Sequence, residues 1–145
     1  VIERNHGADE LLILGLRTRG WELGQTLAKA IETQSGATIA SAQLHISAFR
    51  DDREPSEPIR PEAQVDAKRV LLVDDVLYTG RTIRAALDAV VHWGRPSQIQ
   101  LVTLVDRGHR EVPIQPDFVG RVIPTTQGAR VRVDVESGFQ VVLED

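Results

Sequence analysis

Continuous runs of apolar residues, separated by polar turns, set the framework of this chain. Leu11–Leu14 and Val70–Val73 are uninterrupted apolar runs, which is typical of strands buried on both faces of a parallel sheet. The tail differs, because valines alternate with polar residues there, and this pattern predicts a half-exposed strand, antiparallel at a sheet edge. The expected strands are Leu11–Leu14, Leu44–Phe49, Val70–Val73, Ile99–Val105 and the alternating residues Val131, Val133 and Val135.

Two segments between these strands carry apolar residues at helical spacing. The first follows a turn at residues 16–20, and Gly36 is its expected stop. The second starts after Thr82 and ends at Gly94. Strand, helix and strand at this spacing predict a βαβ unit with a right-handed crossover. The fold class that follows is α/β, with a parallel sheet flanked by helices.

Length and composition indicate a single domain over residues 1–145. Val1–Gly7 reads as the end of a helix stopped by glycine, so we expect that an N-terminal helix is lacking. The 41% of apolar residues suffices for a core, and the net charge of −4 argues against a protein that is basic all over. There is no cysteine for disulfides or thiolate metal sites, no apolar run of about 20 residues and no signal peptide. These features predict a soluble cytoplasmic protein without a membrane partner.

Asp51–Lys68 is unlike the rest of the chain, since it combines three prolines with many charges and few apolar residues. It is expected to be a mobile surface loop. Its composition fits a simple connector as well as a cover over an active site.

The stretch VLLVDDVLYTGRT, Val70–Thr82, concentrates chemistry where a buried strand ends. Ligands of open α/β sheets lie beyond the carboxyl ends of the strands, where Asp74 and Asp75 are expected. The following turn leads into a helix N-terminus, which favours a phosphate, and Gly80 lets the backbone close around its oxygens. The acids suit ribose hydroxyls or Mg²⁺. A helix cap at Thr82 and an ordinary strand-end acid are the plainer alternatives; neither the P-loop nor the dinucleotide-binding glycine pattern is present.

Val70–Thr82 also closely resembles the phosphoribosyl pyrophosphate (PRPP) signature of type I phosphoribosyltransferases. Other stretches are similar to the PyrR family, bifunctional pyrimidine-operon attenuators and uracil phosphoribosyltransferases, and the likeness runs from Leu11 to about Val135. These stretches are GLRTRG (15–20), FRDD (49–52), GRPSQIQLVTLVDRGHREVPI (94–114) and DFVGRVIPT (117–125).

The resemblance implies a type I phosphoribosyltransferase-like fold with a small hood. It implies that uracil and PRPP give UMP and pyrophosphate with Mg²⁺, and that the protein forms a homodimer or higher homo-oligomer. The implied catalytic residues are Asp74, Asp75 and Arg107, and the two aspartates also bind the metal, largely through PRPP and water. The implied PRPP and UMP contacts are Thr18, Arg19, Arg60, Asp74, Asp75, Val76, Leu77, Tyr78, Thr79, Gly80, Arg81, Thr82, Arg107 and Val131.

Elementary chemistry agrees with these roles. Glycosyl transfer passes through an oxocarbenium-like state, and the departing pyrophosphate calls for Mg²⁺ and arginine. Asp75 could stabilise the cationic sugar, which we favour, or take a proton from the base. His109 could be catalytic, although a loop hydrogen bond is the favoured interpretation.

The resemblance further implies UMP-dependent binding to a stem-loop of pyrimidine-operon mRNA. Arg110 and Arg121 match basic positions of the RNA face, whereas Gln115 stands where relatives usually carry a basic residue. Alternatively, the two arginines are solvated or paired with Glu111 and Asp117. A different class of function also stays open: an RNA-binding regulator that only senses nucleotides. Thr18 and Arg19 favour the enzyme, because a UMP sensor has no need for a pyrophosphate turn.

Overall fold

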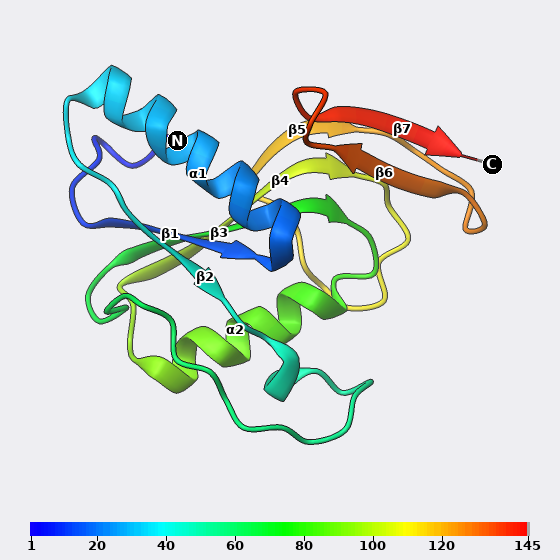
Figure 1. Cartoon of the computed structure of the whole chain (residues 1–145), viewed down its shortest axis with the longest axis horizontal. Coiled ribbons are helices and arrows are strands. Elements are labelled where there is room, and N and C mark those ends of the chain that lie inside the picture. Colours follow the sequence, from blue (N-terminus) through cyan, green and yellow to red (C-terminus); the bar gives the residue numbers. More distant parts are fainter. Residues whose placement is uncertain (145) are drawn as a thin grey trace.

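The computed structural model describes residues 1–144, in which a parallel sheet of five strands lies between two helices (Figure 1). The strand order is β2-β1-β3-β4-β5, and every neighbouring pair is parallel. This arrangement confirms the predicted fold class. The elements of the sheet layer are β1 (Leu11–Leu16), α1 (Arg17–Ser35), β2 (Ala40–Leu44), β3 (Arg69–Leu77), α2 (Arg81–Trp93), β4 (Gln98–Asp106) and β5 (Phe118–Val122).

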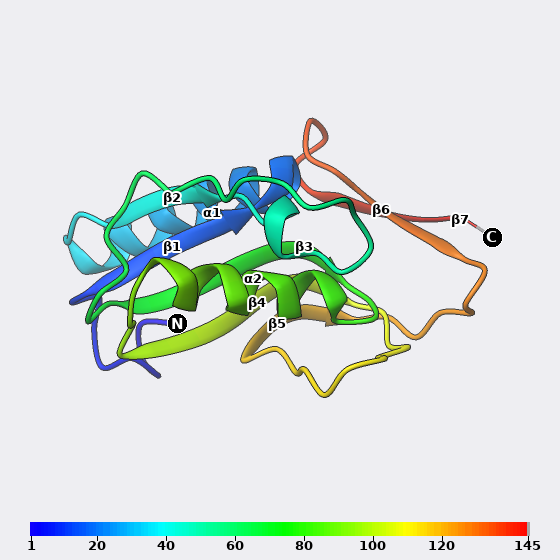
Figure 2. The ribbon, with the colours of Figure 1, turned by 90° about the horizontal axis from the view of Figure 1, so that it is seen from below.

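The core explains why the central strands read as unbroken apolar runs. Side chains alternate between the two faces of a strand, and here both faces are covered, as the view in Figure 2 shows. Leu12, Leu14 and Leu72 belong to the cluster packed with α2. Ile13 and Leu71 belong to the cluster packed with α1. All five side chains are at most 1% exposed, so a polar residue at any of these positions would lose its water contacts.

Several boundaries differ from those predicted. The expected turn at residues 16–20 is the first turn of α1, which starts directly after β1. The expected strand Leu44–Phe49 is wrong: β2 ends at Leu44 because its partner β1 ends opposite it at Leu16, and Ser47–Phe49 forms a short 3-10 helix, η1. The strand predicted at Val70–Val73 is confirmed, and it continues to Leu77 alongside β4.

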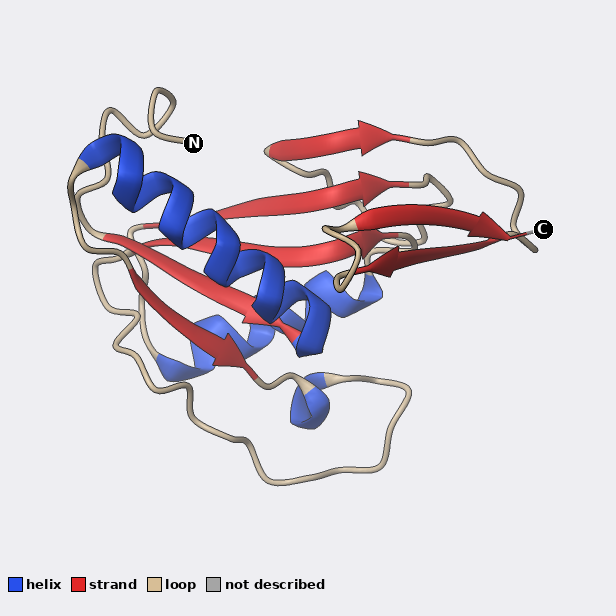
Figure 3. Cartoon of the chain, turned by 45° about the horizontal axis from the view of Figure 1, so that its top comes forward, coloured by secondary structure: helices blue, strands red, loops and turns tan. Residues whose placement is uncertain are grey.

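The C-terminal strand prediction is half right. β6 (Arg130–Asp134) does pair antiparallel, but its partner is β7 (Gln140–Glu144), and the two form a separate sheet. They do not extend an edge of the main sheet, whose fifth place is taken by β5. Figure 3 shows this hairpin beside the carboxyl ends of the main strands. It forms the small hood implied by the family resemblance.

Residues 51–68 contain no helix or strand, as their composition predicted. Val1–Gly7 forms hydrogen-bonded turns, with Asn5 and Gly7 N–H donating to Val1 and Ile2 carbonyls. No helix in the described part of the chain combines the length and apolar character needed to cross a membrane.

Candidate active site

Two helix N-termini meet at the carboxyl edge of the sheet. α1 begins at Arg17, immediately after β1, and α2 begins at Arg81, after the loop that follows β3. Within the described residues, neither cap position, Leu16 or Gly80, makes a side-chain capping bond, and neither first turn contains an acid. The positive end of the helix dipole therefore remains available to anions at both places, together with first-turn backbone N–H groups other than that of Arg81, which donates to Thr79 Oγ1.

The acid pair lies between these two helix ends. β3 pairs with β1 only as far as Val73, because β1 has by then turned into α1, but it continues along β4. Asp74 and Asp75 thus lie within a strand rather than after it, yet still beyond the end of β1. Asp74 is buried and accepts the Asp75 N–H at 3.0 Å, whereas Asp75 is half-buried and lines the cavity described below. Burial, reinforced by the neighbouring charge of Asp75, raises the pKa of Asp74.

Glycine lets α1 lie directly on this strand. A Cβ atom at Gly20 would come within 2.6 Å of the Val73 carbonyl oxygen and 3.2 Å of Asp74 Cα. Only a residue without a side chain fits so close an approach. The first turn of α1 and the acid pair are consequently held in one unit.

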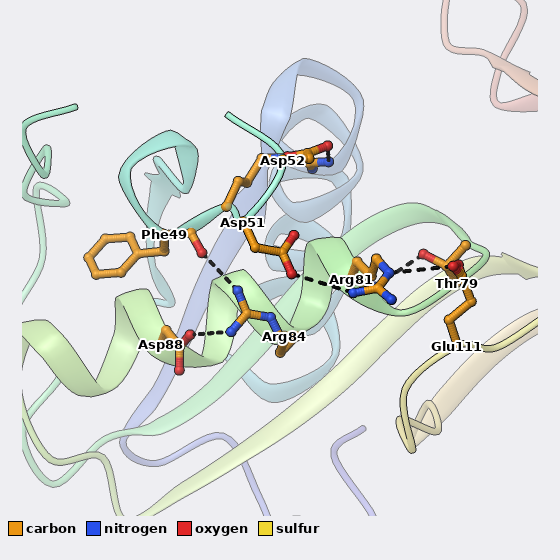
Figure 4. Close-up of polar contacts among 9 residues, drawn as sticks. Phe49, Asp51, Asp52, Thr79, Arg81, Arg84, Asp88 and Glu111 are labelled. Carbon is orange, nitrogen blue, oxygen red and sulfur yellow. Dashed lines mark hydrogen bonds and ion pairs between the residues drawn. The ribbon is translucent and has the colours of Figure 1, made fainter. Parts of the chain in front are cut away.

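The loop before α2 and the first two residues of that helix, which together we call the phosphate loop (Tyr78–Thr82), are held from both sides (Figure 4). The Arg81 guanidinium lies 3.4 Å from carboxylates of both Asp51 and Glu111, and Arg81 N–H donates to Thr79 Oγ1 at 3.3 Å. α2 begins at Arg81, so the alternative of a helix cap at Thr82 is wrong.

Thr82 instead receives a hydrogen bond from Arg50, whose Nη1 donates to Thr82 Oγ1 at 3.1 Å. The hydroxyl proton of Thr82 is then left to donate to a ligand. Arg50 also binds Asp52 in a bidentate pair, and its hydrogen bonds lower the pKa of Asp52 to about 2. The FRDD stretch therefore supports the phosphate loop from the side of η1.

The residues that follow β4 lie against the phosphate loop at Tyr78. Arg107 is buried and lies 4.1 Å from the Tyr78 ring centroid. Its Nε donates to Thr125 Oγ1 at 3.1 Å and its Nη2 to the Thr126 carbonyl at 3.0 Å. His109 Nε2 lies 2.5 Å from the Thr125 carbonyl, which supports the loop hydrogen bond rather than a catalytic histidine.

A cavity of about 700 Å³ lies between the first turn of α1, Asp75 and the β6–β7 hairpin, and neither the phosphate loop nor Arg107 lines it. Of the predicted site residues, Thr18, Arg19 and Asp75 line it; the hairpin contributes Val133, whereas the predicted Val131 on the same strand does not line it. Arg17 and Arg132 also line it and were not predicted. Arg17 could have been found in the GLRTRG stretch, whereas nothing in the local sequence marks Arg132, because its place depends on how the hairpin folds back.

Other predicted residues lie elsewhere. The Arg60 guanidinium lies 5.5 Å from the ring centroid of Trp93, at the far end of α2, so the loop would have to move to bring it to the cavity. Arg121 is exposed on β5, and Gln115 is exposed as well. Arg110 is not paired with Glu111 or Asp117; it binds Asp106 at 2.6 Å.

The acidic side chains of the site limit which metal ion it can hold. Among residues 1–144 no group of three or more histidine, aspartate or glutamate side chains is placed to hold a metal ion. The half-buried Asp75 carboxylate beside the buried Asp74 fits Mg²⁺ better than a metal that needs a full set of protein ligands. Mg²⁺ keeps several waters and binds through one or two carboxylates together with substrate phosphates.

Comparison with known proteins agrees with this geometry. Residues 2–137 match the family model described as phosphoribosyl transferase domain. The chain is 49% identical over 144 residues to the bifunctional protein PyrR of Limosilactobacillus fermentum, with 94% of this chain and 80% of that protein covered. It is 46% identical over 148 residues to the bifunctional protein PyrR of Bacillus cereus, with 97% and 82% covered.

Among solved structures, the hypoxanthine phosphoribosyltransferase of Trypanosoma cruzi has the same fold. Its TM-score is 0.70 at 18% identity, with 92% of this chain and 75% of that chain covered. The match to the family model and the identity to the two bacterial proteins confirm the family predicted from the sequence. The chain belongs to the phosphoribosyl transferase domain family and, within it, to the PyrR proteins.

Proposed function

We propose that the protein is a uracil phosphoribosyltransferase that forms UMP and pyrophosphate from uracil and PRPP, and that it also binds pyrimidine-operon mRNA. One observation carries the first half: the N-termini of α1 and α2 both lie at the carboxyl edge of the sheet, one on each side of the acid pair, and the first turn of α1 shares a cavity with Asp75. PRPP carries phosphates at both ends of a ribose, so its shape and charge match this spacing of anion sites around carboxylates.

In this reaction the bond from the anomeric carbon to pyrophosphate breaks, uracil N1 bonds to that carbon, and the N1 proton passes to water. The phosphate loop holds the 5-phosphate, while Arg17 and Arg19 balance the charge of pyrophosphate. Asp75 lies where the sugar becomes cationic and stabilises it. The base lies between the Arg107 region and the hairpin.

Mg²⁺ belongs to the proposal, held by PRPP, water and the Asp74–Asp75 pair. When bound there, the ion would supply positive charge to the leaving pyrophosphate. Chelation of Mg²⁺ is expected to abolish turnover, and added Mg²⁺ should restore it. Full activity in excess chelator would remove the metal from the reaction.

The deciding assay measures UMP formation from uracil and PRPP, with hypoxanthine and orotate as alternative bases. We expect product with uracil alone. Product with hypoxanthine or orotate instead would overturn the base assignment, and no product with any base would leave a regulator that only senses nucleotides.

The RNA half rests on relatives named bifunctional and on the exposed Arg121. In this role the protein binds an mRNA stem-loop in the cytoplasm and acts as a homodimer or larger assembly. UMP is expected to tighten RNA binding, and by linkage RNA then tightens UMP binding.

Filter binding over a salt series tests this half. Gln115→Arg adds one cation, so binding should tighten and the slope of log affinity against log salt should steepen by about one unit. Uracil transfer should not change. A protein that does not distinguish the stem-loop from an unrelated hairpin, with or without UMP, would be an enzyme only.

A further inference from the structure

Arg110, which the family resemblance places on the RNA face, directs its guanidinium into the protein. Its Nη1 donates to the Tyr78 carbonyl at 2.9 Å, its Nε to the Ile114 carbonyl at 2.8 Å, and its Nη2 to Asp106 Oδ2 at 2.6 Å. Its side chain is only 18% exposed, and that of Asp106 is 13% exposed. All three guanidinium nitrogens are thus engaged in internal bonds.

The residues after Arg110 continue this contact along the phosphate loop. Glu111 and Val112 N–H both donate to the Thr79 carbonyl, at 2.9 and 3.3 Å. A Cβ at Gly80 would come within 2.8 Å of Val112 Cγ2, so the two segments are in close contact. Residues 110–112 therefore hold two successive carbonyls of the phosphate loop, those of Tyr78 and Thr79.

Holding these carbonyls determines where the amide groups point. In a trans peptide the C=O and N–H directions are opposed, and no cis peptide bond occurs among the described residues. When the Tyr78 and Thr79 carbonyls face residues 110–112, the Thr79 and Gly80 N–H groups face the other way. Successive N–H groups on one side of a turn form a cradle for an anion.

We infer that Arg110 is a positioning residue for the ribose 5-phosphate of PRPP and UMP: by holding the Tyr78 carbonyl and pairing with Asp106, it fixes the Thr79 and Gly80 N–H groups toward the phosphate. This inference rests on the proposed transferase function. It assigns Arg110 to the nucleotide site, through its contact with the phosphate loop. Of the two arginines that the family resemblance assigns to RNA, Arg121 then remains available for RNA contact.

The test compares Arg110→Gln and Arg110→Lys with Arg95→Gln, which removes one charge from an exposed arginine outside the site. Loss of hydrogen bonds from a charged group predicts that Arg110→Gln raises KM for PRPP by roughly tenfold. The KM for uracil and kcat at saturating PRPP should stay near wild type. Arg110→Lys keeps the charge but not the fork of donors, so an intermediate KM is expected. Arg95→Gln should match wild type.

Calorimetric titration with ribose 5-phosphate separates this inference from the proposed function. Wild type should bind ribose 5-phosphate, and Arg110→Gln should bind it roughly tenfold more weakly, whether or not UMP is formed. A wild type that binds but makes no UMP refutes the transferase and keeps the inference. Equal binding by wild type and Arg110→Gln, or no binding by wild type, overturns the inference. Should Arg110→Gln fail to fold, Arg110→Lys decides: a wild-type KM for PRPP would overturn it.

Discussion

The two helix N-termini at the sheet edge are built in opposite ways. The phosphate loop before α2 is tied down by Arg110, Arg50 and the pairs of Arg81. At α1, the side chains of Arg17, Thr18 and Arg19 are exposed, and in the described residues none of them makes a hydrogen bond or ion pair. The 5-phosphate stays on the ribose through the proposed reaction, whereas pyrophosphate leaves. A rigid cradle suits the first and an open turn suits the second.

Substitution of Asp75, which lies between the N-termini of α1 and α2, is expected to have the largest effect on turnover. Asp75→Asn should keep the fold and lower kcat by about a hundredfold, because one charge contact to the developing sugar cation is lost in the site. Steady-state kinetics with Asp88→Asn, an exposed acid on α2, as the control would show this. Near-normal turnover of Asp75→Asn would remove this carboxylate from the mechanism.

The next effect concerns the contact that joins α1 to the acid pair. Gly20→Ala places a methyl group 2.6 Å from the Val73 carbonyl oxygen, so we expect a loss of about 2 kcal/mol in the free energy of unfolding. Gly128→Ala is the matched control, since a Cβ there meets nothing within 4 Å. Equal urea midpoints for the two variants would mean that the close approach is not needed for the fold.

Substitutions in the exposed first turn of α1 should weaken PRPP binding without changing the stability of the fold. Arg19→Gln removes a cation from the pyrophosphate turn, and we expect KM for PRPP to rise about tenfold while the unfolding midpoint stays unchanged. Lys29→Gln, exposed further along the same helix, is the control. A fall in the unfolding midpoint of Arg19→Gln would show that this turn, too, is internally tied.

The contacts that hold the phosphate loop should affect how the stability of the protein depends on pH, through the Asp106–Arg110 ion pair. Burial alone would raise the pKa of Asp106, but hydrogen bonds from Arg110 and from Gly108 N–H outweigh it, so the pKa lies below its ordinary value. A carboxylate with a lowered pKa adds stability above its unfolded-state pKa, and that stability is lost as pH falls through the folded-state value.

Asp106→Asn should therefore cost about 1 kcal/mol of unfolding free energy at neutral pH and progressively less in acid. Urea unfolding of both proteins from pH 7 to pH 3 measures the difference. A difference that grows toward low pH would have the wrong sign for this pair.

The smallest effect is expected in the loop of residues 51–68, between η1 and β3. Residues 51–68 are largely exposed and lack regular structure, so their amides should exchange fast without PRPP and more slowly with it. The phosphate loop should be protected in both states. Equal exchange of residues 51–68 with and without PRPP would exclude a closing lid.

The sequence by itself determined strands β1, β3 and β4 of the sheet and the segment that forms the phosphate loop. Strands buried on both faces must be apolar throughout, so Leu11–Leu14 and Val70–Val73 could be read directly. The Asp74–Thr82 stretch combines strand, acids, turn and helix start within a few residues, and its chemistry is local. The Gly36 stop of α1 was equally visible, since a left-handed backbone there, with φ of 73°, favours glycine.

Only the tertiary structure decided which residues meet across the chain. β5 was not predicted, because an exposed edge strand needs no apolar pattern, and Phe118–Val122 is largely exposed. The β6–β7 hairpin lies over the site through contacts that no local spacing encodes. Arg110 is the clearest case, because the sequence does not show whether an arginine points into solvent or into the protein. The carbonyls of Tyr78 and Ile114 and the carboxylate of Asp106 around its guanidinium show that it points inward.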